Sequence, residues 1–132
     1  MTGETELAAL LAGMQPVLQP GVVVFATVAD EVELPVGVDP VMVFREREGR
    51  TLILREVDAA AAGIPSTFPS RMITLEVHSS LEAVGFLAAI TTALAAAGIG
   101  VNPVSGYFHD HLFVPTDRAE DAMAVLERLA PG

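Results

Sequence analysis

The alternation of hydrophobic and polar positions divides the first half of the chain into short segments. Helical spacing of leucine and methionine predicts an opening helix, which is broken by the two prolines of "QPVLQPG". β-Branched runs predict three strands, and the glycine between the last two is typical of a hairpin turn. The acidic stretch 30–40 is expected to be a loop and "STFPS" a linker. The predicted elements are a helix at 4–14, strands at 22–29, 41–47 and 51–57, and a helix of at most two turns within 58–65.

The second half has a more regular pattern. Apolar alternation predicts three strands, and two longer segments have the spacing of helices. Gly98 is expected to end the first of these helices, and Thr116 and Asp117 stand at the start of the second. The predicted elements are a strand at 71–78, a helix at 79–98, strands at 99–108 and 109–115, and a helix at 116–130.

The order of these elements predicts the fold class. The second half reads β-α-β-β-α, which is a ferredoxin-like unit without its closing strand, and the first half reads α-β-β-β-α. We therefore expect an α+β protein of two ferredoxin-like (βαββαβ-type) units, with antiparallel sheets covered by helices on one face. Two incomplete units that exchange a strand would explain the missing element. The expected division is one unit over 1–66 and a second over 67–132.

Composition excludes several functional classes. Of the 132 residues 52% are hydrophobic and 18% charged, which is typical of a folded globular chain. The net charge of −10 argues against binding nucleic acid. All seven basic residues are arginine and cysteine is absent, which removes Schiff-base lysines, P-loop lysines, disulfides, thiolate nucleophiles and cysteine-rich zinc sites.

The sequence has no feature that indicates targeting to a membrane. Its N-terminus carries acids and lacks the positive region of a signal peptide. The stretch 81–101 approaches the length of a membrane span, but alanine, threonine and glycine fill much of it, which favours a buried helix. A cytoplasmic location is the expectation.

The stretch "VHSSLEAVGFLAAI" joins a predicted strand to a predicted helix. Ser79 or Ser80 can cap that helix, and Ser79 with Glu82 forms a capping box. Val84 falls on the apolar stripe of the helix. Neither capping nor the apolar stripe explains Gly85. Glycine inside a helix costs about 0.5–1 kcal/mol relative to alanine. Close approach of another backbone, or room for a small ligand, would offset that cost.

The run "ITLEVHSSLEAVGFLAAITTALAAAGIGVNPVSGYFHDHLFVP" resembles an ACT domain. The chain as a whole is similar to a bacterial group of small tandem ACT proteins, in which "FREREG", "VHSSLEAVG" and "GYFHDHLFVP" have counterparts. Its second half also resembles the C-terminal ACT units of aspartate-kinase regulatory regions and of cytosolic arginine sensors. This resemblance implies binding of an amino acid or another small effector, commonly at an interface between ACT units.

The resemblance also implies a candidate site. In the arginine sensors a comparable junction carries glycine and glutamate, and an aspartate precedes the "LVP"-like strand. The matching residues here are Glu82, Gly85 and Asp110. The start of a helix can receive a ligand carboxylate, and the two acids can hold an ammonium group. The candidate ligand-binding residues are Ser79, Ser80, Leu81, Glu82, Gly85, Val104 and Asp110.

The turn "HDH" offers a second kind of chemistry. His109 and His111 stand two residues apart, so on a strand both imidazoles lie on one face, and Asp110 could ligate a metal or orient a histidine. His78 is the remaining histidine and a candidate third ligand. A polar structural turn, part of an effector pocket and a metal site are the three interpretations, in that order of preference.

Three functional hypotheses follow. The first is a non-catalytic, amino-acid-binding regulatory or sensor module that needs no cofactor and assembles as a homodimer. The second is a ligand-free module for protein–protein interaction or dimerisation. The third is a metal-dependent enzyme at His109, Asp110 and His111. No nucleophile elbow, zinc-protease or dinucleotide-binding motif supports catalysis.

Overall fold

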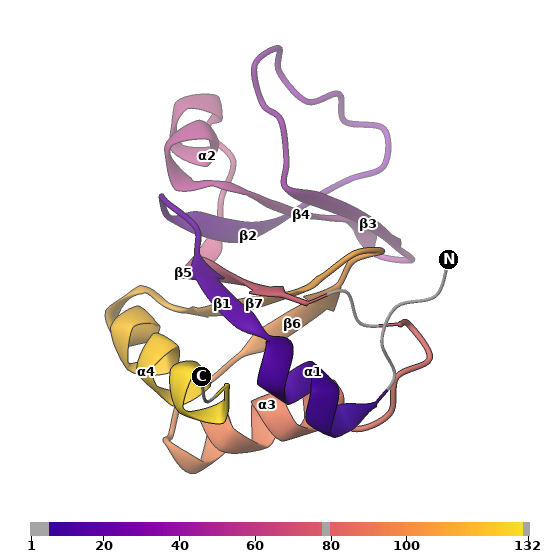
Figure 1. The fold of residues 1–132 in the computed structure, drawn as a ribbon. Helices are drawn as coiled ribbons and strands as arrows, with labels where there is room; N and C mark the ends of the chain where they lie inside the picture. The colour runs from indigo at the N-terminus through magenta and orange to yellow at the C-terminus, as the bar shows by residue number, and fades with distance from the viewer. Residues whose placement is uncertain (1–5, 78–79, 131–132) are drawn as a thin grey trace. The chain divides into compact units, whose positions relative to one another are not determined.

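The computed structural model describes residues 6–77 and 80–130, which fold into two compact units (Figure 1). One unit combines Met1–Pro20 with Arg71–Gly132 and is called the split unit below. The other is Gly21–Ser70, called the continuous unit. Each unit has its own cluster of buried hydrophobic residues.

The split unit contains a complete ferredoxin-like arrangement. Its strands lie in the order β1-β5-β7-β6, with β1 antiparallel to β5 and β6 antiparallel to β7. The chain from β5 onward supplies β-α-β-β-α, and β1 from the N-terminal region supplies the strand that closes the motif. A strand from the first half of the chain, β1, therefore completes the sheet of the second half, as expected. Its elements are α1 (Leu7–Gly13), β1 (Gln15–Leu18), β5 (Thr67–Glu76, from Arg71 onward), α3 (Phe86–Ala96), β6 (Asn102–Ser105), β7 (Asp110–Pro115), the 3-10 turn η1 (Thr116–Arg118) and α4 (Ala119–Leu129).

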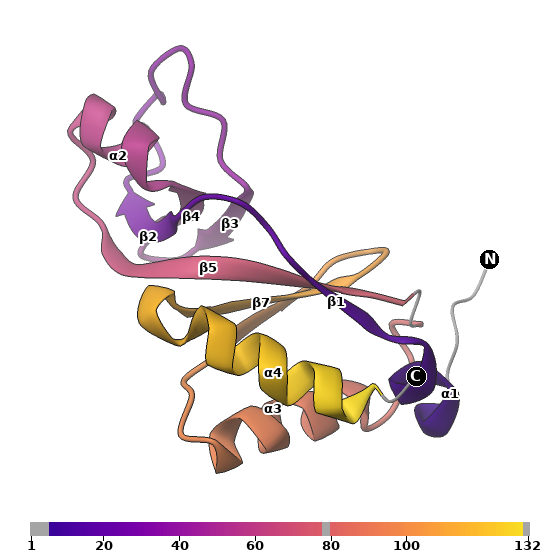
Figure 2. The same ribbon diagram turned by 60° about the vertical axis from the view of Figure 1, so that its left-hand side comes forward.

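One face of this sheet packs against α3 and α4, as Figure 2 shows. Alternate strand residues face the helices, and the helices contribute residues three to four positions apart. The main contacts come from Ile73 and Leu75 of β5, Leu112 and Val114 of β7, Ile90 and Leu94 of α3, and Ala122 and Leu126 of α4.

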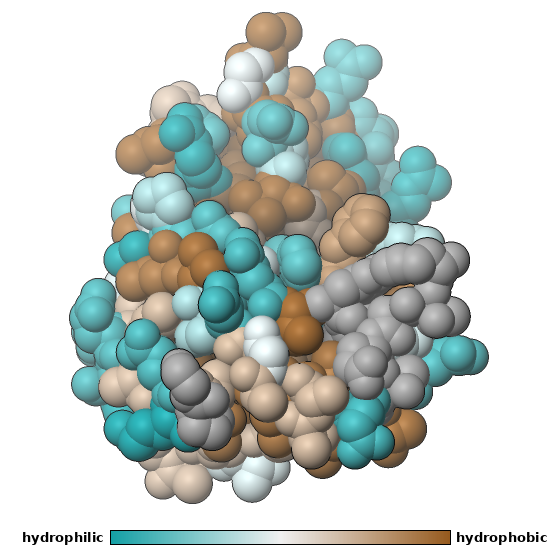
Figure 3. Space-filling view, viewed as in Figure 1, coloured by the Kyte–Doolittle hydropathy of each residue, from teal (hydrophilic) through white to brown (hydrophobic). Residues whose placement is uncertain are grey.

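Small side chains dominate two helices of the split unit. The sequences are "LAALLAG" in α1 and "FLAAITTALAA" in α3, and these helices contact each other. Weakly hydrophobic residues, drawn in tan, gather over this part of the unit at the lower centre of Figure 3.

The strand β1 corrects the prediction that "QPVLQPG" only breaks the chain. The amide of Gln19 donates to the carbonyl oxygen of Met72 at 2.9 Å, and β1 runs in register with Gln15 opposite Glu76. Hydrogen bonds in an antiparallel pair alternate, so Pro16 stands where its backbone faces away from β5. A proline is tolerated there because no N–H is needed for the ladder.

The strands of the continuous unit also have the order of the ferredoxin-like motif, but one of the two helices of that motif is missing. Its strands lie in the order β3-β4-β2-β5, and a loop over 29–41 stands where the first helix of the motif would be. "STFPS" is not a linker: its residues from Thr67 to Ser70 begin β5 and pair with β2, because both edges of β2 need partners. The elements are β2 (Val23–Val28), β3 (Met42–Glu46), β4 (Gly49–Arg55), α2 (Glu56–Ala62) and the first four residues of β5.

The predicted hairpin forms with its turn at residues 47–48, and Gly49 begins the returning strand. A Cβ atom at Gly49 would lie 2.8 Å from the carbonyl oxygen of Val28 on β2. The close approach of β2 therefore favours glycine at this position, and so does its backbone φ of 152°.

The compact units do not follow the expected division at residues 66 and 67. The helix α1 and the strand β1 pack with the second half of the chain, because β1 covers the edge of β5 and Leu10 and Met14 enter the core of the split unit. The fold class, two ferredoxin-like α+β units, is as predicted. The compact units are defined by contacts in space and do not test where one domain of the sequence ends and the next begins. The division of the sequence at 66/67 therefore stays a prediction.

A candidate small-molecule cavity at the start of α3

The helix α3 begins at Phe86, later than predicted. Gly85 is its N-cap residue, with φ 90° and ψ −13°. Residues other than glycine rarely adopt this left-handed conformation, so the backbone itself explains the glycine. A Cβ atom here would lie 3.7 Å from Cδ2 of Leu7, an ordinary contact. The interpretation of Gly85 as a close-packing position inside a helix was therefore wrong.

The residues before Gly85 form a turn and not the first turn of a helix. The hydroxyl of Ser80 accepts a hydrogen bond from the amide of Glu82 at 3.0 Å, a local turn stabilised by serine. Val84 is 83% exposed, so its predicted place on the core stripe was wrong. The proposed capping box and His78 cannot be compared with the structure, because residues 78 and 79 lie outside the described residues.

This turn, the start of α3 and the β6–β7 hairpin enclose a cavity of about 200 Å³ within the split unit. Three of the predicted ligand-binding residues line it: Ser80, Leu81 and Asp110. Glu82 and Gly85 are next to lining residues in the sequence, but they do not line the cavity themselves. The complete lining is Ser80, Leu81, Ala83, Phe86, Leu87, Ser105, Gly106 and Asp110.

Asp110 supplies the charge of this cavity. Its side chain is 9% exposed, and the hydroxyl of Ser105 donates a hydrogen bond to Oδ1 at 2.7 Å. The other carboxylate oxygen, Oδ2, has no hydrogen bond to another residue of the described chain. A largely buried carboxylate with one oxygen that no residue of the described chain occupies is suited to bind an ammonium group or another donor.

The β6–β7 hairpin fixes the position of this carboxylate. The amide of Gly106 donates to the carbonyl oxygen of His109 at 2.9 Å, which closes the turn before Asp110. A Cβ atom at Gly106 would lie 3.0 Å from the same oxygen, so a side chain here would require the turn to shift by a few tenths of an ångström. Ser105 and Asp110 are cross-strand partners and therefore share one face of the hairpin.

Val104, predicted as a ligand-binding residue, belongs to the opposite face. It pairs with His111 across the hairpin, one residue out of phase with Ser105 and Asp110. Adjacent strand residues point to opposite faces, so Val104 is absent from the lining and Ser105 takes that place. The glycine-containing turn "GYFH" could have indicated this pairing, because it sets Ser105 directly opposite Asp110.

On that opposite face, His111 belongs to a polar chain across the sheet of the split unit. Its Nδ1 lies 3.0 Å from the hydroxyl of Thr74, which also accepts a hydrogen bond from Nε2 of Gln19 at 3.0 Å. Burial lowers the pKa of His111 below its ordinary value, and the nearby His109 lowers it further, while Asp110 opposes both. His111 therefore has its partner in the sheet and does not face the cavity.

Among residues 6–77 and 80–130, no three histidine, aspartate or glutamate side chains are grouped so that they could hold a metal ion. Asp110 and His111 lie on opposite faces of β7, because they are consecutive strand residues. The described residues thus give the metal hypothesis no ligand set.

The fold and the cavity define a class: a protein of two ferredoxin-like units with a small, partly apolar cavity where a strand leads into the first helix. The chain belongs to the ACT domain family. Family models for an ACT domain match residues 2–71 and 67–128. The residues common to both matches, 67–71, are the start of β5, the strand that runs through both units.

Solved structures share the fold of this chain. A Vibrio cholerae protein described as of unknown function and a possible transport protein is 42% identical, with a TM-score of 0.86 over 95% of this chain and 96% of that one. An Agrobacterium tumefaciens protein is 17% identical, with a TM-score of 0.73 over 88% of each chain. The regulatory subunit of aspartate kinase from Thermus thermophilus has a TM-score of 0.65 at 10% identity, over 92% of this chain and 99% of that one, which shows a shared fold.

A search of curated proteins found no match to the chain. No helix within the described residues has both the length and the hydrophobicity needed to cross a membrane. The apolar segment 81–101 instead contains α3, whose Ile90 and Leu94 are fully buried in the core of the split unit.

Proposed function

We propose that the chain is a non-catalytic regulatory module that binds an amino acid in the cavity at the start of α3. Membership of the ACT family and the likeness to aspartate-kinase regulatory subunits support a regulatory, small-molecule-binding role. The observation that carries the amino-acid assignment is Asp110, a buried carboxylate that faces the first residues of a helix across a small cavity.

The two charges of a free amino acid suit the two sides of this cavity. Asp110 and Ser105 offer oxygen atoms to the ammonium group. Phe86 and Leu87, the first two residues of α3, line the opposite side, and α3 has no side-chain cap. The first amides of a helix lack intrahelical acceptors and carry a partial positive charge, so they can receive the carboxylate. Leu81 and Ala83 leave apolar surface for a side chain.

A thermal-shift panel of the common amino acids tests this proposal. An amino acid present at about 100 times its dissociation constant should stabilise the fold by about 2.7 kcal/mol. At the same ligand concentration Asp110→Asn should reduce this stabilisation by about half or more, because it removes the charge and keeps the shape of the side chain. Asp117→Asn is the matched control, since Asp117 is exposed in η1 and outside the cavity. A panel in which no amino acid stabilises the wild-type chain would overturn the proposal.

The expected homodimer is part of the same proposal. The strand β3 is the last in the strand order of the continuous unit, and its Val43 and Phe44 are 49% and 62% exposed. Exposed apolar residues on an edge strand favour pairing with another chain. This observation also suits the second hypothesis, an interaction module without a ligand. Sedimentation of the wild type and of Phe44→Lys measures the assembly, and the panel above decides whether a ligand exists. A cytoplasmic location stays a prediction.

A further inference from the structure

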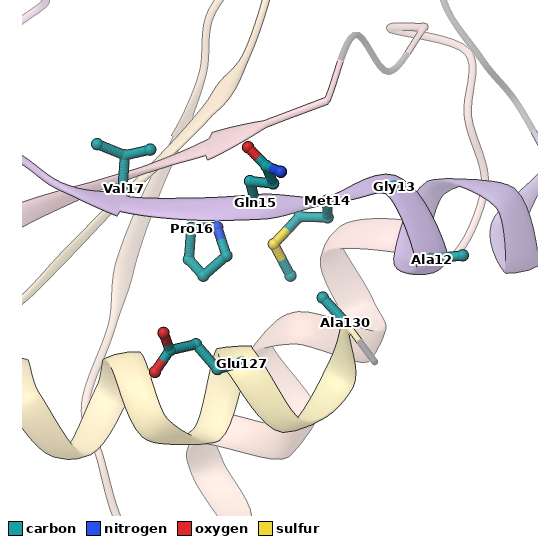
Figure 4. Close-up of a pocket in the computed structure, with 8 residues that line it drawn as sticks. All are labelled: Ala12, Gly13, Met14, Gln15, Pro16, Val17, Glu127 and Ala130. Carbon is teal, nitrogen blue, oxygen red and sulfur yellow. The ribbon is translucent and has the colours of Figure 1, made fainter. Parts of the chain in front are cut away.

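A second and larger cavity lies elsewhere in the split unit. It has a volume of about 590 Å³ and lies between β1 and the C-terminal end of α4 (Figure 4). It shares no lining residue with the cavity at the start of α3. The lining residues are Ala12, Gly13, Met14, Gln15, Pro16, Val17, Glu127 and Ala130.

The side chains that point into this space are apolar apart from one carboxylate. Figure 4 shows Met14, just before β1, and Pro16 of β1 directed toward α4, and Glu127 directed from α4 toward Pro16. Gln15 and Val17 point to the other side of β1, as alternate strand residues must. The amide side chain of Gln15 therefore does not reach into the space between β1 and α4.

The end of α4 offers hydrogen-bond acceptors on one side of this cavity. Pro16, on the other side, has no N–H to donate. Glu127 and Ala130 belong to the end of α4, where the last carbonyl groups lack intrahelical partners and carry a partial negative charge.

The electrostatic character of the cavity follows from these groups. None of the eight lining residues carries a positive charge, and within the described chain Glu127 has no ion-pair partner. The carboxylate and the helix end both favour a cation and disfavour an anion. Pro16 and the alanines supply an apolar wall for the carbon atoms that carry it.

We propose that this cavity binds an organic cation: a guanidinium or ammonium group on a short apolar stem, without a carboxylate of its own. The site is separate from the amino-acid site, because a free amino acid would place its carboxylate among acceptors here. The proposal does not depend on the proposed function, and either can fail without the other.

Amide NMR of the full chain with n-butylguanidinium as the probe tests the site. Neutral n-butylurea, which has nearly the same shape, is the control compound. At about 0.15 M salt, which screens the general attraction of a cation to an acidic protein, the probe should give saturable shifts at the amides of Ala12, Gly13, Gln15 and Val17. Butylurea should give smaller shifts at the same concentrations.

Two variants on the same helix test the role of the carboxylate. Glu127→Gln should weaken binding of the probe by about fivefold, near the upper end for an exposed ion pair. Glu120→Gln, which makes the same charge change at an exposed position outside the cavity, should leave the affinity unchanged. Saturable shifts at the cavity that weaken only in Glu127→Gln support the site. Shifts that are absent, equal for butylurea, or equally weakened in both variants would overturn it.

Discussion

At the scale of single residues, the structure changes the reason for Gly85. The sequence could show that a glycine stood near a helix start, but not where the helix began, because the apolar spacing continues through Leu81 and Val84. The turn stabilised by Ser80 shortens α3 and places Gly85 at a left-handed position. Asp110 was identified from the resemblance, whereas Ser105 needed the register of the hairpin.

The left-handed conformation of Gly85 predicts the effect of a substitution. Gly85→Ala should lower the free energy of unfolding by about 1–3 kcal/mol, since a side chain in this region strains the backbone. Gly100→Ala is the control, because Gly100 has no positive φ and a Cβ atom there would meet no other atom within 4 Å. Urea unfolding measures both variants, and equal losses would contradict the backbone explanation.

The lowered pKa of His111 predicts how stability depends on pH. Because the folded-state pKa lies below the unfolded value of about 6.5, the unfolded chain binds the proton more readily. The contribution of His111 is thus fully present above about pH 6.5 and is lost as the pH falls through the folded-state value. NMR titration of the ring protons gives this pKa. His109→Gln should raise it, and an ordinary His111 pKa would contradict the assignment.

At the scale of elements, the sequence predicted the helices and strands with strong periodicity and missed those that depend on a distant partner. The hairpin β3–β4, the strand β2 and the helix α4 lie near their expected positions. The strand β1 contains Pro16 and is followed by Pro20, and the start of β5 looks like a linker, so neither has a local signal. Both form because an adjacent strand supplies their hydrogen bonds.

The alternating register of β1 predicts its hydrogen exchange. The amides of Gln15, Val17 and Gln19 face β5 and should exchange slowly, whereas the amide of Leu18 faces the free edge and should exchange faster. Amide exchange followed by NMR makes the comparison within one strand. Slow exchange at Leu18 together with fast exchange at Val17 would show a shifted register.

At the scale of the whole molecule, the central feature is that the N-terminal region completes the fold of the second half. The fragment 67–132 contains the candidate amino-acid cavity but lacks β1, so the edge of β5 from Ile73 to Glu76 and part of the core are uncovered. We expect this fragment alone to remain largely unfolded. Addition of the peptide 1–20 should restore its structure, as measured by circular dichroism. A stably folded fragment without the peptide would support the division at 66/67 instead.

The most direct test of the proposed function is calorimetric titration of the whole chain with the amino acid that gives the largest thermal shift. The account predicts saturable binding by the wild type, a loss of at least about tenfold in affinity for Asp110→Asn, as expected when a charged hydrogen-bond partner is removed, and unchanged affinity for Asp117→Asn. Binding that survives Asp110→Asn at wild-type affinity would contradict the claim that this buried carboxylate holds the ligand.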